Sequence, residues 1–227
     1  MNVAVSMRIT NEVNYHEIRD SISHDLVNNL VNQNLVPIPI PNSDLDPAKY
    51  FEKIPIDGLI LSGGDDLIFE ENLSQEKKNK YKRDKVELNL LNFALSKKIP
   101  IIGICRGMQL INIHFGGKLT LLSKKSHINT NHQVTTVVKT NIFPEKKFIV
   151  NSFHKNIIKK EEMSSEFFEI LYSEDDSVES FVHKKLPIIG VMFHPERKFK
   201  QDRIHNFFTN LFYKNVFNFL LERKWIP

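Results

Sequence analysis

The single cysteine of the chain, Cys105, lies between an apolar run and a segment with helical spacing. Residues 99–104 are rich in β-branched side chains and predict a buried strand, and residues 108–114 predict the start of a helix. A side chain at so sharp a strand-to-helix turn needs small neighbours, which Gly103 and Gly107 supply. The N–H groups and dipole of the helix N-terminus favour a thiolate, so the pattern G-x-C-x-G predicts a nucleophilic cysteine.

A base for this thiol is offered by His194, which follows a second apolar run at residues 187–193. A lone cysteine can equally be a small buried apolar side chain, so the presence of a base is what favours catalysis. Glu196 stands two residues after the histidine, and residues i and i+2 of an extended segment project to the same side. Pro195 supports that extended conformation. The carboxylate can hold one imidazole nitrogen while the other faces the thiol, which predicts a Cys-His-Glu triad.

Strands and helices are predicted to alternate through the first half of the chain. Such alternation is typical of an α/β protein with a mostly parallel sheet and helices on both of its faces. Ligands of such sheets bind beyond the carboxyl ends of the strands, where Cys105 is expected. The expected strands are residues 3–7, 35–40, 56–61 and 99–104, and the expected helices are residues 15–31, 82–95 and 108–114.

The second half of the chain predicts an antiparallel extension of this sheet, because several β segments follow one another there. After them comes an aromatic-rich stretch with helical spacing, which predicts a helix packed on the sheet. Part of the apolar face of this helix could serve a homodimer. The expected β segments are residues 133–138, 147–150, 166–171, 177–182 and 187–193, and the expected helix is residues 202–225.

Two adjacent glycines, Gly63 and Gly64, follow the strand expected at residues 56–61. Without a Cβ, such a turn can present backbone N–H groups to a ligand, as an oxyanion hole requires. A plain turn is the alternative that these residues leave open. Because Cys105 also follows a strand of the same predicted sheet, the glycines and the thiol are expected to meet at one edge.

Three motifs, in chain order D-G-L-I-L-S-G-G-D-D, G-I-C-R-G-M-Q and F-H-P-E, resemble those of the class I glutamine amidotransferase-like superfamily. The form C-R-G resembles the γ-glutamyl hydrolase branch, a peptidase C26-like group that includes γ-glutamyl-γ-aminobutyrate hydrolase. The resemblance covers nearly the whole chain. It implies one three-layer, flavodoxin-like α/β domain over residues 1–227, with the central sheet flanked by helices.

The resemblance also implies a cysteine-dependent hydrolase that cleaves the C–N bond of a small γ-glutamyl conjugate through a thioester and releases glutamate. Cys105 would attack the carbonyl, His194 would move the protons and Glu196 would orient the imidazole. Backbone N–H groups of the Gly63–Gly64 loop and of Arg106 would stabilise the oxyanion. Further contacts to the substrate are implied for Gly64, Asp65, Arg83, Gln109, Ser152, Phe153 and His154.

The chain departs from the family pattern at two positions. Lys155 stands where the motif V-N-S-x-H is often followed by a second histidine. Asp176 replaces the glycine of a motif D-G-x-x-E, whose acidic residue here is Glu179. We expect a structural part for Glu179, whereas Lys155 bears on the identity of the substrate.

The identity of the leaving amine stays open. The substrate could be a γ-glutamyl amine or a γ-glutamyl nucleotide phosphoramidate such as γ-glutamyl-CDP-amidate, as in capsule decoration. A glutaminase subunit that passes ammonia to a separate synthetase chain is a second function, since no synthetase is fused here. An inactive binding module is a third. The form C-R-G favours the stand-alone hydrolase. Basic side chains that could receive a phosphate, or else are surface or structural charges, are Arg83, Arg106, Lys155 and Lys198.

Composition and motifs exclude several other classes. The net charge of +4 is spread over scattered lysines rather than one basic face, so we expect no nucleic-acid partner. No apolar run reaches the roughly 20 residues of a membrane span, and the first residues lack the features of a signal peptide, so we expect a cytoplasmic protein. No glycine-rich phosphate loop indicates ATP or a dinucleotide, so no cofactor is expected.

Two histidines five residues apart, His127 and His132, raise the question of a metal site. No cysteine, aspartate or glutamate stands near them at ligand spacing. His132 also matches a histidine that the family places before a β segment. The sequence therefore predicts no metal.

Overall fold

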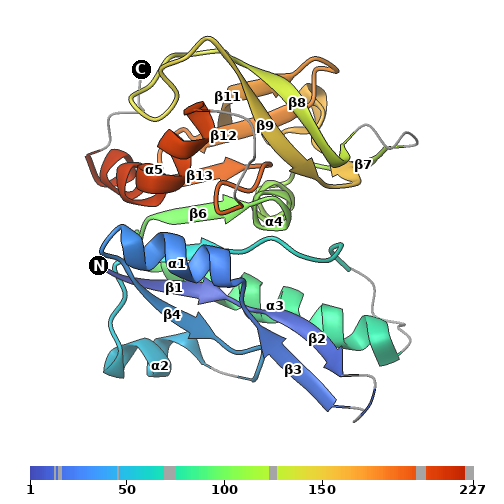
Figure 1. Cartoon of the computed structure of the whole chain (residues 1–227). Coiled ribbons are helices and arrows are strands. Elements are labelled where there is room, and N and C mark those ends of the chain that lie inside the picture. The colour runs from blue at the N-terminus through green and yellow to red at the C-terminus, as the bar shows by residue number, and fades with distance from the viewer. Residues whose placement is uncertain are drawn as a thin grey trace.

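The computed structural model of the protein describes residues 1–12, 14, 17–44, 46–68, 75–122, 127–197 and 203–222. A nine-stranded sheet forms its centre (Figure 1). In spatial order the strands are β4 (Val36–Ile40), β1 (Asn2–Ser6), β5 (Gly58–Leu61), β6 (Ile101–Ile104), β13 (Ile188–Val191), β12 (Val178–His183), β11 (Phe167–Ser173), β8 (Ile128–Thr136) and β9 (Lys147–Phe153).

The sheet has a parallel and an antiparallel half. Strands β4, β1, β5, β6 and β13 pair in parallel. From β13 onward, through β12, β11, β8 and β9, each strand pairs antiparallel with the next. In Figure 1 the antiparallel strands form the upper part of the molecule, above β6 and α4 (Arg106–His114). The α/β class and the antiparallel extension predicted from the sequence are thus confirmed.

Helices cover both faces of the parallel half, because alternate strand residues point to opposite sides. Val3 and Val5 of β1 belong to the same buried cluster as Leu26 and Leu30 of α1 (His24–Asn32) and residues of α5 (Arg203–Glu222). Ala4, between the two valines, belongs to the cluster on the opposite face. That second cluster includes residues of α2 (Pro47–Lys53), α3 (Gln75–Lys97) and α4.

Two predicted helix boundaries were wrong. The helix expected over residues 15–31 begins only at His24, and a hairpin of β2 (Arg8–Glu12) and β3 (Glu17–Ser21) precedes it. Ile18, counted as part of the helical apolar face, pairs with Asn11 in that hairpin and is 53% exposed. Its spacing from Leu26 and Leu30 fitted a helix, but a partner strand supplied its backbone hydrogen bonds instead.

The long helix α3 begins at Gln75 rather than at residue 82. The remaining elements are β7 (Thr120–Leu121), β10 (Asn156–Ile157), which pairs antiparallel with β7, and the 3-10 helix η1 (Lys160–Glu162). Within the described residues, every helix is too short or too polar to cross a lipid bilayer.

Candidate active site

Cys105 stands at the junction between β6 and α4, as predicted. Its φ of 49° and ψ of −103° lie in a region that non-glycine residues avoid, which costs on the order of 1–3 kcal/mol. The backbone N–H of Cys105 donates to the carbonyl of Val191 at 2.7 Å, which ties the turn to β13. A Cβ at Gly107 would lie 2.1 Å from the carbonyl oxygen of Leu61, so only glycine fits there. The geometry is that of a nucleophile elbow.

His194 and Glu196 follow β13, the parallel neighbour of β6, so they reach the same edge of the sheet as Cys105. The Nδ1 atom of His194 lies 2.7 Å from Oε1 of Glu196, and both side chains are buried. Burial alone would lower the pKa of His194, but the Glu196 charge and hydrogen bonds to Cys105 and Glu196 raise it to about 9. The imidazole is therefore held between a carboxylate and the thiol.

Two residues from other elements fix the position of His194. The side-chain amide of Asn151, in β9, accepts from the backbone N–H of His194 at 2.8 Å and donates to its carbonyl at 2.9 Å. A Cβ at Gly63 would lie 2.5 Å from Cε1 of His194, so the glycine allows the loop to approach the ring. The motif V-N-S-x-H indicated this region, but no part was predicted for its asparagine.

Arg83, in α3, holds the backbone of the Gly63–Gly64 loop in place. Its Nη2 donates to the carbonyls of Ser62 and Gly63 at 2.9 and 3.1 Å. Its Nε donates to Glu87 at 2.9 Å. Since Arg83 is buried and directed at the backbone of the loop, it positions the loop.

The Arg106 side chain is buried in an ion-pair network between α4 and α3. Its guanidinium contacts Asp84 and Glu87, and all three side chains are buried. Burial raises the pKa of Asp84 to about 6, against the effect of the Arg106 charge. Of the two readings of Arg106, phosphate contact or structural charge, this geometry favours the structural one. Lys198, another residue considered for phosphate contact, lies outside the described residues.

A cavity of about 310 Å³ opens beside the thiol. Ser152, expected at the substrate, does not line this cavity; its side chain is buried and its hydroxyl donates to the carbonyl of His127 at 2.8 Å. The Gln109 side chain reaches the cavity and donates to the carbonyl of Asn156 at 3.1 Å. The cavity is lined by Gly64, Asp65, Asp66, Cys105, Gln109, Phe153, His154 and Lys155.

Two cations that were not predicted from the sequence, Arg8 and Arg197, lie near Cys105. The Arg197 guanidinium is 4.1 Å from the ring centre of Phe153, a residue of the cavity wall. Nε of Arg8 donates to the carbonyl of Gly63 at 3.1 Å. Burial and the Arg8 charge lower the pKa of Arg197, and the Glu196 and Cys105 charges oppose this shift. Their positions in the sequence could have indicated both residues, because Arg8 follows the first strand and Arg197 directly follows F-H-P-E.

The fold is that of the class I glutamine amidotransferases. The solved structure of a glutamine amidotransferase from Thermotoga maritima superimposes with a TM-score of 0.60 at 17% identity, over 100% of this chain and 86% of that one.

The family follows from the sequence comparison. The family model for Peptidase C26 matches residues 2–196, and the chain belongs to this family. It is 33% identical over 202 residues to the γ-glutamyl-CDP-amidate hydrolase of Campylobacter jejuni, which covers 87% of this chain and 91% of the relative. It is 34% identical over 160 residues to a subunit of the glutamine-hydrolysing GMP synthase of Methanococcus aeolicus, covering 69% and 73%. Family and relatives support a hydrolase.

Proposed function

We propose that this protein hydrolyses the amide bond of a γ-glutamyl conjugate and releases glutamate. The proposal rests mainly on the backbone conformation of Cys105, whose φ of 49° marks the sharp turn that places this residue at the cavity. The buried His194–Glu196 pair beside it, joined at 2.7 Å, supplies a base whose orientation is fixed.

The reaction proceeds in two halves. His194 takes the proton of Cys105, and the thiolate attacks the δ-carbonyl of the glutamyl group. Backbone N–H groups of the Gly63–Gly64 loop and of Arg106, the first residue of α4, stabilise the oxyanion. His194 then protonates the departing amine, and a thioester forms. Water, activated by the same imidazole, cleaves the thioester and releases glutamate.

The charges around the cavity favour a conjugate with two unlike ends. The Asp65 and Asp66 carboxylates, which line the same cavity as Gln109, suit the α-ammonium group of the glutamyl end. Lys155 in the cavity wall and Arg197 above Phe153 suit an anionic leaving group. Because the Campylobacter relative is a γ-glutamyl-CDP-amidate hydrolase, we propose a phosphorylated leaving amine of this kind.

The test measures glutamate release by the purified protein from glutamine, γ-glutamyl-γ-aminobutyrate and γ-glutamyl-CDP-amidate, with Cys105→Ala as the inactive control. We expect fast release from the phosphoramidate and little from glutamine. A Cys105→Ala protein that keeps its activity would overturn the mechanism. A role in capsule decoration follows only if the nucleotide conjugate is the substrate.

Charge reversal separates phosphate recognition from general effects. Lys155→Glu is expected to raise KM for the phosphoramidate about tenfold or more, and to spare the neutral-amine substrate γ-glutamyl anilide. Lys139→Glu, the same change at an exposed lysine outside the cavity, is the matched control. Equal effects of Lys155→Glu on both substrates would refute phosphate recognition by this residue.

The similarity to a subunit of GMP synthase favours one alternative, a glutaminase that supplies ammonia to a synthetase. Such a protein would hydrolyse glutamine, and more so with its synthetase present. Glutamine hydrolysis that exceeds release from both conjugates would select this alternative.

A further inference from the structure

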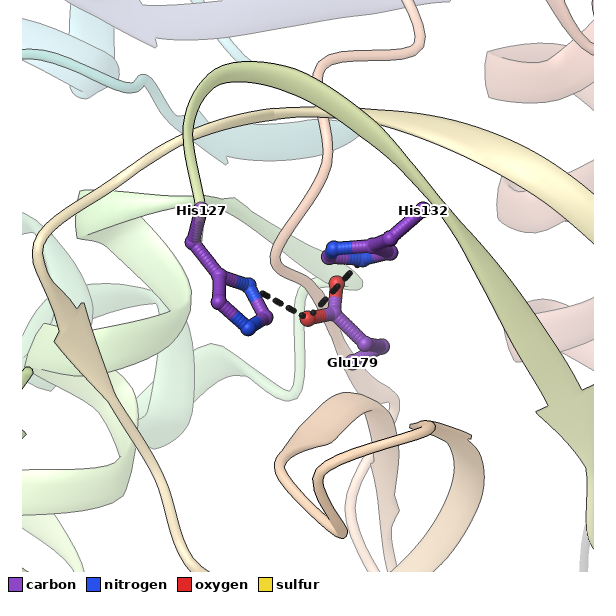
Figure 2. Close-up of side chains that lie close together, drawn as sticks. All are labelled: His127, His132 and Glu179. Carbon is purple, nitrogen blue, oxygen red and sulfur yellow. Dashed lines mark ion pairs between the residues drawn. The ribbon is translucent and has the colours of Figure 1, made fainter. Parts of the chain in front are cut away.

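Three imidazoles surround one buried carboxylate next to the catalytic cavity. Oε1 of Glu179, in β12, lies 3.3 Å from Nε2 of His132 in β8, 3.7 Å from Nδ1 of His127 and 3.8 Å from Nε2 of His154. Figure 2 shows the rings of His127 and His132 directed at the carboxylate. We name His127, His132, His154 and Glu179 the histidine cluster. His154 also belongs to the wall of the cavity.

The atoms that face one another in this cluster have no hydrogen-bond partner within the described part of the chain. They are also nearly inaccessible to solvent, since His127, His154 and Glu179 are each less than 5% exposed. A buried carboxylate that accepts no hydrogen bond carries a large desolvation cost. A positive charge, either a proton on one of the rings or a bound cation, would offset this cost.

The outer ring nitrogens show where the protons are. Nε2 of His127 lies 2.9 Å from a carboxylate oxygen of Asp175, and Nδ1 of His154 lies 3.0 Å from the carbonyl of Asn156. Both partners only accept hydrogen bonds, so both outer nitrogens carry the hydrogen. In a neutral ring, the inner nitrogens then direct their lone pairs at Glu179. Lone pairs facing a carboxylate repel it unless a cation lies between them.

We infer that the histidine cluster binds one divalent first-row transition-metal cation, represented here by Zn²⁺. The ligands would be His127, His132 and Glu179, whose ligand atoms lie within 4.8 Å of one another. Bonds to a tetrahedral zinc ion place neighbouring ligand atoms about 3.4 Å apart. The 3.3 and 3.7 Å separations from Glu179 are close to that value. Two imidazoles with one carboxylate are an established zinc donor set.

Neighbouring residues support the same assignment. A histidine ligand usually donates its other ring N–H to a carboxylate or carbonyl, as His127 does to Asp175. His154 meets the same condition through Asn156 and could complete the site as a fourth ligand. The prediction of no metal considered only residues near the histidines in sequence, whereas Glu179 comes from another strand. Bound metal would join β12 to β8 and hold the cavity wall at His154.

The test uses the full chain with Cys105→Ser, since the catalytic thiol is itself a metal ligand. After removal of metals with a chelator, the protein is titrated with Zn²⁺ and with Co²⁺. We expect one equivalent of bound metal, a visible Co²⁺ absorption typical of tetrahedral coordination, and a Tm that rises with Zn²⁺. Because this variant lacks the thiol and the readout is metal binding, the outcome does not depend on the proposed hydrolase activity.

Two variants and one control locate the site. Glu179→Gln and His132→Gln, made in the Cys105→Ser chain, are expected to weaken Zn²⁺ binding at least about 100-fold, since even outer-shell changes cost 10–100-fold. His24→Gln, at an exposed histidine, is expected to leave it unchanged. His132 is the less buried of the two positions, so it keeps the test usable if Glu179→Gln does not fold. Absence of stoichiometric binding, or equal binding by all three variants, would overturn the inference in favour of a proton shared among the histidines.

Discussion

Removal of the charge of Glu196 is the sharpest test of the triad. Glu196→Gln keeps an oxygen that can accept from Nδ1 of His194, but it removes the carboxylate charge. Since the pKa of His194 lies at about 9 instead of 6.5, the folded protein favours the imidazolium by about 3 kcal/mol. Burial opposes this preference, and Glu196 supplies the largest favourable part. We therefore expect kcat/KM to fall about 100-fold.

The assay is glutamate release from the preferred conjugate, together with the rate at which iodoacetamide alkylates Cys105. Both rates are expected to fall, because the imidazolium that stabilises the thiolate becomes less stable. Glu161→Gln, at an exposed carboxylate of η1, is the matched control. A Glu196→Gln protein that keeps more than half of the wild-type kcat/KM would refute the role of the carboxylate.

The same change has a pH signature in stability. A pKa raised in the folded state contributes stability that is complete below the unfolded pKa of 6.5 and is lost as pH rises through about 9. The difference in unfolding free energy between wild type and Glu196→Gln should therefore be largest near pH 6 and small above pH 9. Urea unfolding at several pH values measures it. A difference that grows with pH would contradict the account.

Two further predictions concern the support of the site. In Gly63→Ala, the new Cβ would lie 2.5 Å from the His194 ring. We therefore expect kcat to fall at least about tenfold in a protein that remains folded by circular dichroism, and an unchanged kcat would contradict this contact. Arg106→Met leaves Asp84 buried without its cation and leaves Glu87 with Arg83 alone, so urea unfolding should show a loss of about 3–5 kcal/mol. A loss below about 1 kcal/mol would show that the network is dispensable.

Local patterns were enough to predict much of the fold. The β-branched runs before Cys105 and before His194 are strands β6 and β13, because β-branched side chains fit the buried, pleated surface that both runs occupy. The hairpin of β2 and β3 was missed, because its strands are stabilised by pairing with each other. Neither strand has a strong local apolar pattern that would have predicted it. Apolar spacing around Ile18 fitted a helix equally well, and only the partner strand decided between them.

The sequence by itself predicted the turn that presents Cys105 and the pairing of His194 with Glu196. Each of these lies within a few residues. A glycine two residues either side of Cys105 permits the elbow. The extended backbone expected for residues 194–196 was wrong: the N–H of Arg197 donates to the carbonyl of His194 at 3.2 Å, and this turn brings the Glu196 carboxylate back to the imidazole. Only the tertiary structure brought Asn151 and Gly63 to His194, and Glu179 to His132 of another strand. These contacts join residues that are far apart in the chain. Their distances are set by strand pairing and packing, which no local sequence pattern encodes.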